Sequence, residues 1–539
     1  MEKIARTFEN ILDKKISLIF WCVNFLGIIT VRLYLDKFIA KSDVPLFYLI
    51  IDIHNLLFFF ISFSLVWLVL SIILKKTPFD LAAFMLWAML TIIFPPIFDL
   101  MMTGKYVFWS FYLVSSPSDL FWQYVTIFGH LPSGIVYFGT KIVFIGGILT
   151  LTFLVFLKTK KFLAAILTAW GAYSALFFMA AFPSFFYYAY RLLSGNNISS
   201  VHSFEIVQFF SKSKVLGLEL ENPFYALAYD LNLLYFPFCL AILSYFFWKS
   251  QPKMFGAVLR NFRYPQVIFH AGLLFLGLGV GFWIYPENFN SNPFSFLAIF
   301  CALSSVLLAW KASVVVNDIF DYRVDLLSNP ERPLQKGIFT VNQYSQLGAL
   351  LFFLSLIGGL LVHYKLGILL FVYQVLAWFY SAPPFRLKRF VPIASILSAL
   401  TLLTVFFSGF IFFSPEQNLD RLSWRVVFLL IITYTLSLPV KDFKDIAGDA
   451  HDGVKTVPVI FGEEKGRLIV ASGIFLSFVL SVFLLNVAGL FWWAILFGTL
   501  SYFIMINKKI HPRNLFWWIL GVVTAYGLIL VKIAFELTF

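Results

Sequence analysis

The feature that most restricts the fold of this chain is a series of apolar runs that recurs along its whole length. Many of the runs are about 20 residues long, enough for an α-helix to cross the hydrocarbon core of a bilayer. Hydrophobic residues make up 61% of the chain and charged residues only 12%. Soluble domains carry about twice that charged fraction. The sequence therefore predicts an all-α polytopic membrane protein.

The apolar runs fall into two groups on either side of a polar, basic connector at 248–266. We expect six segments in the first group, at roughly 16–36, 46–74, 79–102, 133–157, 161–190 and 223–248. We expect nine in the second, at roughly 267–285, 296–316, 343–362, 366–381, 391–414, 424–440, 468–486, 488–506 and 515–536. The predicted domains are an N-terminal membrane domain, 1–250, of unknown function, and a second membrane domain, 251–539.

Basic residues in the loops predict the side of the membrane on which each loop lies, because Lys and Arg collect in cytoplasmic loops. They follow the even-numbered segments, for example at 75–76, 158–161 and 386–389. We therefore expect a multi-pass protein with a cytoplasmic N-terminus and with its C-terminus on the opposite side. The loop after the eighth segment, 317–342, is then cytoplasmic.

Charge and cysteine content exclude two other classes of protein. The net charge of +13 is accounted for by the cytoplasmic loops, and no basic run outside the spans is interleaved with aromatic residues. A nucleic-acid partner is therefore not expected. Cys22, Cys239 and Cys301 lie far apart inside apolar runs, so neither a disulfide framework nor a zinc site is expected.

Carboxylates interrupt the apolar pattern at 317–325, which reads NDIFDYRVD. Asp318, Asp321 and Asp325 directly follow the apolar segment 296–316. If the helix continues into the motif, the three side chains fall within an arc of about 60°. Like charges placed this way repel one another, so the motif needs a cationic partner.

A second acidic motif repeats this spacing at 442–449. Asp442, Asp445 and Asp449 stand at the same relative positions and also follow an apolar segment, on the same predicted side of the membrane. The two motifs together predict a site of six carboxylates without His or Cys. An all-oxygen ligand set suits Mg²⁺, which is usually held by carboxylates together with substrate phosphates.

Basic residues near both motifs indicate an anionic substrate. Arg332 follows the first motif, Arg386 and Lys388 lie in the loop 380–389, and Lys441 and Lys455 flank the second motif. A metal-bridged diphosphate fits this combination of charges. Because the site is expected at the mouth of an apolar bundle, the diphosphate should carry a tail that prefers lipid. The residues therefore point to an isoprenyl diphosphate.

Lys311 is an ionisable residue inside a predicted span, on the same helix face as Asp318. Such residues within a membrane are often functional. A lysine this close to a helix end can also extend its ammonium group to the membrane surface. Both interpretations of Lys311 stay open from the sequence.

Five stretches of the second domain resemble conserved motifs of one family. NDIFDYRVD resembles the motif NDxxDxxxD, and DFKDIAGD (442–449) resembles a second motif, DxxDxxxD. NPERPLQKG (329–337), YSAPPFRLKR (380–389) and GVKTVPVIFG (453–462) match three further stretches in the same order. The segment from about 255 to 539 is therefore similar to the UbiA-type intramembrane prenyltransferases. Residues 1–250 resemble no family that we recognise.

The resemblance implies a fold, an activity and a set of site residues. It implies nine transmembrane helices around an apolar cavity with both acidic motifs at its cytoplasmic mouth. It implies Mg²⁺-dependent transfer of a prenyl group from a prenyl diphosphate to a hydrophobic or amphipathic acceptor in the bilayer. The expected metal ligands are Asp321, Asp325, Asp442, Asp445 and Asp449. The expected substrate-binding residues are Asn317, Arg332, Arg386, Lys388, Lys441 and Lys455. The residues expected at the reaction centre are Asp318, Tyr380, Ser381 and Lys311.

Two questions stay open from the sequence. The acidic motifs would also serve a transporter or a binding protein for phosphorylated lipids. Transporters usually place such sites near the midplane of the membrane, in broken helices, whereas these motifs are expected at the cytoplasmic mouth. The acceptor is also open, between an aromatic or quinone precursor and a lipid precursor.

Overall fold

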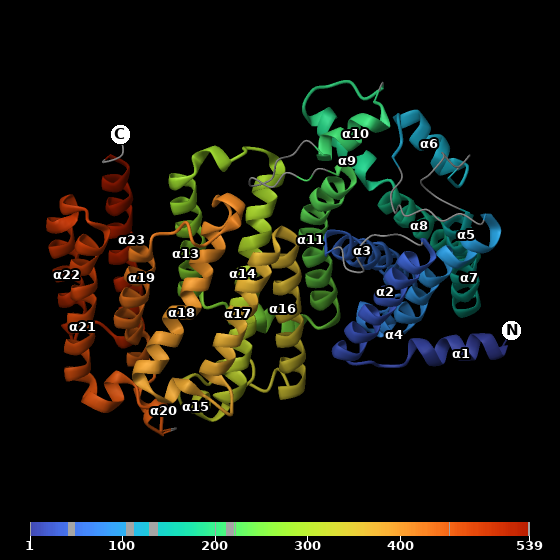
Figure 1. The fold of residues 1–539 in the computed structure, drawn as a ribbon. Helices are drawn as coiled ribbons and strands as arrows, with labels where there is room; N and C mark the ends of the chain where they lie inside the picture. Colours follow the sequence, from blue (N-terminus) through green and yellow to red (C-terminus); the bar gives the residue numbers. More distant parts are fainter. Residues whose placement is uncertain are drawn as a thin grey trace. The chain divides into compact units, whose positions relative to one another are not determined.

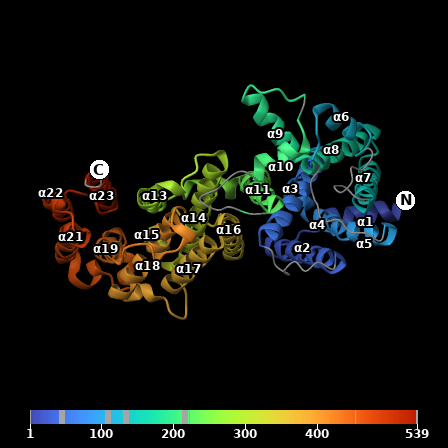
Figure 2. The same ribbon diagram turned by 45° about the horizontal axis from the view of Figure 1, so that its top comes forward.

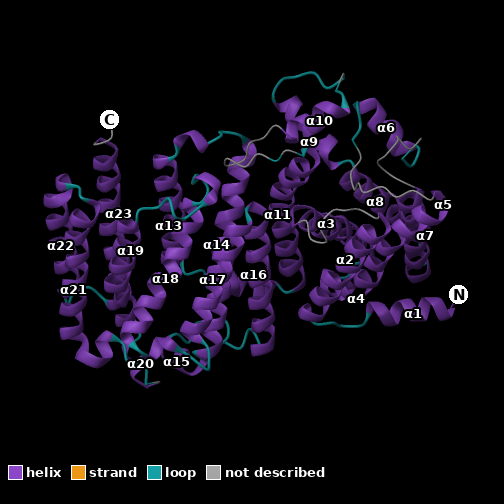
Figure 3. Cartoon of the chain, in the orientation of Figure 1, coloured by secondary structure: helices purple, strands orange, loops and turns teal. Residues whose placement is uncertain are grey.

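The computed structural model of this chain describes residues 2–40, 49–103, 113–128, 138–199, 201–211, 220, 222–451 and 453–536. The described residues form helices and connecting loops, with a single isolated β-bridge between Phe390 and Lys455 (Figure 3). Fifteen helices among them are long and apolar enough to cross a membrane. The expected class, an all-α polytopic membrane protein, is confirmed.

The chain divides into two compact units. One comprises Met1–Phe255 with Asn292–Ala298, and the other comprises Gly256–Ser291 with Ile299–Phe539. The helices of the first unit are α1 (Glu2–Leu12), α2 (Leu18–Ala40), α3 (Leu49–Leu74), α4 (Pro78–Met89), η1 (Leu90–Ile93), α5 (Phe94–Thr103), α6 (Pro117–Val125), α7 (Phe138–Thr159), α8 (Phe162–Ala180), α9 (Phe182–Leu193), α10 (Ser203–Ser211) and α11 (Pro223–Ser250). Within this unit, α3 packs against both α8 and α11.

Two helices, α12 (Pro252–Arg260) and α14 (Pro293–Phe320), begin in the first unit and continue in the second. The other helices of the second unit are α13 (Tyr264–Ile284), η2 (Pro286–Asn288), α15 (Tyr322–Ser328), α16 (Val341–Val362), α17 (Tyr364–Ser381), η3 (Leu387–Arg389), α18 (Val391–Phe410), η4 (Pro415–Gln417), α19 (Trp424–Ser437), η5 (Leu438–Lys444), α20 (Ile446–His451), α21 (Val457–Leu485), η6 (Ala488–Leu490), α22 (Phe491–Ile506) and α23 (Pro512–Glu536) (Figure 1). In both ribbon views α21, α22 and α23 lie together, and α22 packs against the other two (Figures 1 and 2).

Local sequence signals set the helix ends that matter for the second unit. The Thr340 hydroxyl accepts a hydrogen bond from the backbone N–H of Gln343, whose side chain in turn accepts one from the N–H of Thr340. This capping box fixes the start of α16. Prolines in the first turn begin α18, η5 and α23, where the missing N–H would have had no helical partner.

Helices α13 and α18 approach each other closely because glycines face each other. A Cβ atom at Gly277 would lie 2.0 Å from the carbonyl oxygen of Phe406, and one at Gly409 would lie 2.1 Å from that of Leu274. Small residues let helix backbones come together, and in lipid this packing replaces the hydrophobic effect as a source of stability. Both helices also contribute residues to the cavity wall described below.

We expect Gly277→Ala to lower the stability of the folded protein by about 1–3 kcal/mol, because the added methyl group overpacks the contact. Thermal unfolding of the purified protein in detergent measures this change. Gly279→Ala is the control, since a Cβ atom at Gly279 on the same helix would have no heavy atom within 4 Å. Equal effects of the two substitutions would contradict the role of the close contact.

The structure differs from the expected segments at three places. The short helix η1 interrupts the predicted span 79–102 between α4 and α5. The predicted span 161–190 is divided, because α8 ends at Ala180 and α9 begins at Phe182, with Pro183 in its first turn. Helix α21 begins at Val457 rather than near residue 468, and it bends at Gly462, where φ is +77°. The parts of the predicted spans at 46–48 and 133–137 lie outside the described residues.

Candidate active site

The first acidic motif continues the helix that precedes it. The backbone N–H of Asp321 donates to the carbonyl of Asn317, and that of Asp325 donates to the carbonyl of Asp321, each at 2.9 Å. Helical hydrogen bonding therefore passes from α14 into α15 although Asp321 itself departs from helical geometry. This near-continuous helix is the local structure expected from the spacing of the three aspartates.

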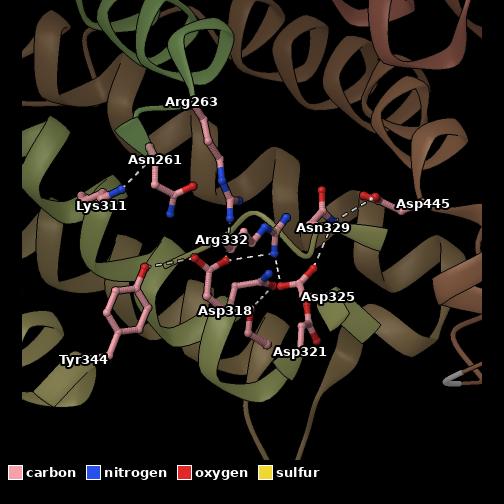
Figure 4. A network of polar contacts seen from close by, with 12 residues as sticks. Asn261, Arg263, Lys311, Asp318, Asp321, Asp325, Asn329, Arg332, Tyr344 and Asp445 are labelled. Atoms are coloured by element: carbon pink, nitrogen blue, oxygen red, sulfur yellow. Dashed lines mark hydrogen bonds and ion pairs between the residues drawn. The ribbon is translucent and has the colours of Figure 1, made fainter. Parts of the chain in front are cut away.

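Asp318 lies at the centre of a buried polar network (Figure 4). Its carboxylate accepts hydrogen bonds from Arg263 at 2.5 Å, from Arg332 at 3.1 Å and from the Tyr344 hydroxyl at 3.1 Å. The Asp318 side chain is fully buried. Three donors from three separate segments satisfy this carboxylate, so the network compensates the charge that the sequence left unpaired.

The other two aspartates of the motif pair with different basic groups. Asp321 forms ion pairs with Lys388 and with Arg386, the latter at 3.2 Å. Asp325 forms an ion pair with Arg332 and accepts a hydrogen bond from Asn329 at 3.1 Å. Arg332 thus bridges Asp318 and Asp325, as Figure 4 shows. Three of the basic residues expected to bind substrate, Arg332, Arg386 and Lys388, are therefore in direct contact with the first acidic motif.

The second motif lies beside the first. Asp442 is in η5 and Asp449 is in α20, which packs against α15. The Asn329 amide contacts both motifs, since it lies 3.1 Å from Asp325 and 3.5 Å from Asp445 (Figure 4). The two acidic motifs, more than a hundred residues apart in sequence, are therefore neighbours in the structure.

Backbone contacts hold the loop 380–389 against the stretch that follows the second motif. The N–H of Lys455 donates to the carbonyl of Arg389 at 3.3 Å, next to the bridge between Phe390 and Lys455. Arg386 has a left-handed conformation, with φ of +42°. The Lys441 ammonium donates to the Tyr380 hydroxyl at 3.2 Å and lies 5.0 Å from the centre of its ring. The loop thus places side chains at both acidic motifs.

These elements surround a cavity of about 390 Å³ in the second unit. Ten of the residues expected at the site line it: Asn317, Asp321, Arg332, Tyr380, Ser381, Lys388, Lys441, Asp442, Asp445 and Asp449. The rest of its wall is largely apolar and aromatic, with residues from α13, α14, α17, α18 and α23. The cavity thus has ionic groups from both motifs and a wall suited to a hydrocarbon chain.

Five expected site residues do not line the cavity: Lys311, Asp318, Asp325, Arg386 and Lys455. Lys311 is buried, and its ammonium group donates to the backbone carbonyl of Asn261 at 2.9 Å. Lys455 is exposed. The structure therefore places Lys311 and Asp318 behind the cavity wall, and Asp325 and Arg386 one contact away from it.

Sequence reasoning did not assign several residues that line the cavity. Arg263 belongs to the basic connector of the sequence, yet it contacts Asp318 and lines the cavity. His270 and Tyr373 lie inside apolar spans, and their hydrogen bond joins positions 103 residues apart. A polar residue within a span was the only available signal for this pair.

Burial raises the pKa of two carboxylates that lie outside the membrane spans. It raises the pKa of Asp325 to about 6, although Arg332 opposes the shift. It also raises the pKa of Asp449 to about 7, and the nearby carboxylates of Asp442 and Asp445 add to the shift. Crowding of like charge thus disfavours ionisation in both motifs. A bound cation would favour it.

The donor set fits a hard divalent cation. One cavity is lined by four carboxylates and one amide, from Asp321, Asp442, Asp445, Asp449 and Asn317. All five side chains offer oxygen ligands, which Mg²⁺ prefers. Among the described residues, no three His, Cys, Asp or Glu side chains converge on a single point. Mg²⁺ typically takes only one or two carboxylates and completes its coordination with substrate phosphates and water.

Comparison with known proteins identifies the family. Residues 273–520 match the model of the UbiA prenyltransferase family. A digeranylgeranylglyceryl phosphate synthase of Methanobrevibacter smithii is 28% identical over 183 residues, which cover 33% of this chain and 62% of that protein. A homogentisate phytyltransferase of Synechocystis is 28% identical over 203 residues, which cover 35% of this chain and 64% of that protein. This chain spans less than two thirds of the length of either relative.

A solved structure gives a similar comparison. A UbiA homolog from Archaeoglobus fulgidus bound to GPP and Mg²⁺ is 19% identical to this chain, with a TM-score of 0.40. The match covers 52% of this chain and 98% of that one. The family model and the motifs in the cavity agree, and residues 273–520 of this chain match the UbiA prenyltransferase family.

Proposed function

We propose that this protein is an intramembrane prenyltransferase, which moves an isoprenyl group from a prenyl diphosphate to an acceptor and releases diphosphate. The observation that carries the proposal is the cavity itself. It gathers aspartates of both acidic motifs with Lys388 and Lys441, next to a largely apolar and aromatic wall. A diphosphate with a hydrocarbon tail matches both parts of this cavity.

The basic side chains provide for the diphosphate. Arg332, Lys388 and Lys441 line the cavity, and Lys388 is already held at the first motif by Asp321. In the proposed reaction these cations bind diphosphate oxygens and stabilise the charge that develops when the bond between C1 of the prenyl group and oxygen breaks. Arg386 acts from behind the wall through its contact with Asp321.

The aspartates provide for the metal. Asp321 with Asn317 from the first motif, and Asp442, Asp445 and Asp449 from the second, would hold Mg²⁺ at the cavity. When bound, Mg²⁺ neutralises part of the diphosphate charge and makes it a better leaving group. Asp325 stays in this proposal as a ligand that becomes available when Arg332 turns toward the diphosphate.

The reaction centre lies where the ionic and apolar parts of the cavity meet. The Ser381 hydroxyl donates to the Asn317 amide oxygen at 3.0 Å, and Tyr380 lies beside it under Lys441. We place C1 of the prenyl group next to these residues, with its tail along the aromatic wall. That wall keeps water from the reactive carbon. We also propose that the cavity mouth faces the cytoplasm.

Diphosphate release by the purified full chain tests the proposal. We expect release from geranylgeranyl diphosphate to require both Mg²⁺ and an acceptor, and to stop when EDTA removes the metal. Two acceptors follow from the names of the relatives: geranylgeranylglyceryl phosphate, an alcohol, and homogentisate, a phenol. Mass spectrometry of the lipid product identifies the prenylated acceptor.

The same preparation separates this function from transport. Proteoliposomes that move the labelled prenyl diphosphate across the bilayer without forming a prenylated product would contradict the proposal and favour a transporter. Liposomes without protein are the control for spontaneous movement of the donor.

A further inference from the structure

A buried histidine and a buried tyrosine form a polar pair in the cavity wall, and neither belongs to an acidic motif. His270 is on α13 and Tyr373 is on α17, and their side chains line the cavity. The His270 Nε2 atom lies 3.0 Å from the Tyr373 hydroxyl. His270 also packs against Trp310, with ring centres 5.9 Å apart. The pair is therefore fixed by a hydrogen bond and by aromatic packing.

The partners of the pair determine the direction of its hydrogen bonds. The Nδ1 atom of His270 lies 2.7 Å from the carbonyl oxygen of Gln266, which can only accept. Nδ1 therefore carries the hydrogen, and in the neutral imidazole Nε2 is an acceptor. The Tyr373 hydroxyl then donates to Nε2, which leaves the lone pairs of its oxygen to accept a hydrogen bond.

Burying two polar side chains within the membrane costs free energy, which suggests that the pair has a function. A polar side chain inside an apolar bundle must be paired, and a residue such as Phe or Leu would fill the same wall without that requirement. The neighbouring Gln374 gives a contrast. It is also buried on α17, but its amide donates to the backbone carbonyl of Ala309 at 3.1 Å, and it does not line the cavity. Gln374 joins helices, whereas Tyr373 lines the cavity and has its hydroxyl at His270.

The position of the pair relative to the motifs suggests what it contacts. Tyr373 interacts with the Ser313 side chain, and Ser313 is one helical turn, about 5 Å, before Asn317 on α14. The pair thus lies one to two helical turns deeper than the contact between Asn317 and Ser381, where C1 of the donor is placed, since Tyr373 is eight residues before Ser381 on α17. An acceptor must approach C1 from the side opposite the diphosphate, which is the deeper side.

We propose that Tyr373, oriented by His270, is the subsite that binds a hydroxyl group of the acceptor, an inference that rests on the proposed prenyltransferase function. The acceptor O–H donates to the Tyr373 oxygen, so the subsite selects a neutral hydrogen-bond donor. In an alcohol this group is the attacking oxygen: its O–H bond breaks as the new C–O bond forms, and the proton leaves with the released diphosphate. In a phenol it is the substituent that directs the ring. Tyr373 contacts the substrate, and His270 is a positioning residue that acts through it.

Tyr373→Phe removes only the hydroxyl group. We expect kcat/KM for the acceptor to fall about tenfold, the worth of one well-formed hydrogen bond. KM for geranylgeranyl diphosphate and the Mg²⁺ requirement should not change, because neither residue of the pair belongs to an acidic motif. The alcohol acceptor and the phenol acceptor are assayed separately, and a loss with either one supports the subsite and identifies the class of hydroxyl.

Variants of His270 distinguish positioning from packing. In His270→Gln the amide oxygen can still accept from Tyr373, so we expect most of the acceptor kcat/KM to be kept. His270→Leu should behave like Tyr373→Phe. Gln374→Met is the matched control, because it removes a buried hydrogen bond next to Tyr373 but leaves the cavity unchanged. It should lower the unfolding temperature without changing kcat/KM per folded enzyme.

Two results would overturn the subsite. One is a wild-type acceptor kcat/KM in Tyr373→Phe with both acceptors. The other is an equal loss in Gln374→Met, which would mean that any buried polar change on α17 has this effect. If the wild-type chain transfers no prenyl group to either acceptor, the proposed function itself has failed, and the subsite with it.

Discussion

Replacing Asp321 with asparagine is expected to lower prenyl transfer by about 100-fold to 1,000-fold, the usual cost of removing one group that stabilises developing charge. Asp321 lines the cavity and forms ion pairs with Lys388 and Arg386. Asparagine keeps the volume but loses the negative charge that would bind Mg²⁺ and hold the two cations. Diphosphate release with saturating Mg²⁺ measures the effect.

The fold should tolerate this substitution. Lys388 remains near other carboxylates, since it also interacts with Asp442 and Asp449. These three residues line the cavity. The unfolding temperature in detergent should stay close to that of the wild type. Near-normal turnover in Asp321→Asn would exclude Asp321 as a metal ligand.

Replacing Asp318 with alanine is expected to affect folding rather than only activity. We expect a loss of stability of about 3–5 kcal/mol, as when one partner of a buried ion pair is removed. Asp318 is fully buried and does not line the cavity. Without it, Arg263, Arg332 and the Tyr344 hydroxyl lose an acceptor within an apolar bundle. Thermal unfolding of the purified protein measures the loss.

The matched control is Asp321→Ala, which removes a carboxylate three residues away in the same motif. It should destabilise the fold much less than Asp318→Ala, because Lys388 keeps the carboxylates of Asp442 and Asp449 nearby. Equal stability of the two variants would show that the network around Asp318 does not anchor the fold. Asp318 would then return as a candidate catalytic residue.

The contrast between these two aspartates also marks a limit of sequence reasoning. The 0, +3, +7 spacing correctly predicted that the motif continues its helix. It could not predict that Asp318 would be buried, because that depends on Arg263 from one segment and Tyr344 from another. A helical face can be predicted from periodicity, whereas the residues that pack against it depend on the tertiary fold.

Hydropathy and length predicted the membrane class, since the bilayer fixes how long an apolar helix must be. The same measure misplaced the start of α21, because its first turns contain Glu463 and Glu464 at the polar end of the helix. Hydropathy and length also did not identify His270 and Tyr373 as a pair. Each is a single polar residue in an apolar span, and only packing of α13 and α17 around one cavity makes them a pair.

The ion pair between Asp321 and Lys388 has a thermodynamic consequence for ligand binding. A divalent cation that takes Asp321 releases Lys388, and an anion that takes Lys388 releases Asp321. Each ligand therefore removes a competitor of the other, and the coupling free energy is the same in both directions. Such heterotropic cooperativity would make the apparent affinity for the cation depend on the concentration of the anion. The apparent affinity for the anion would depend on the concentration of the cation in the same way.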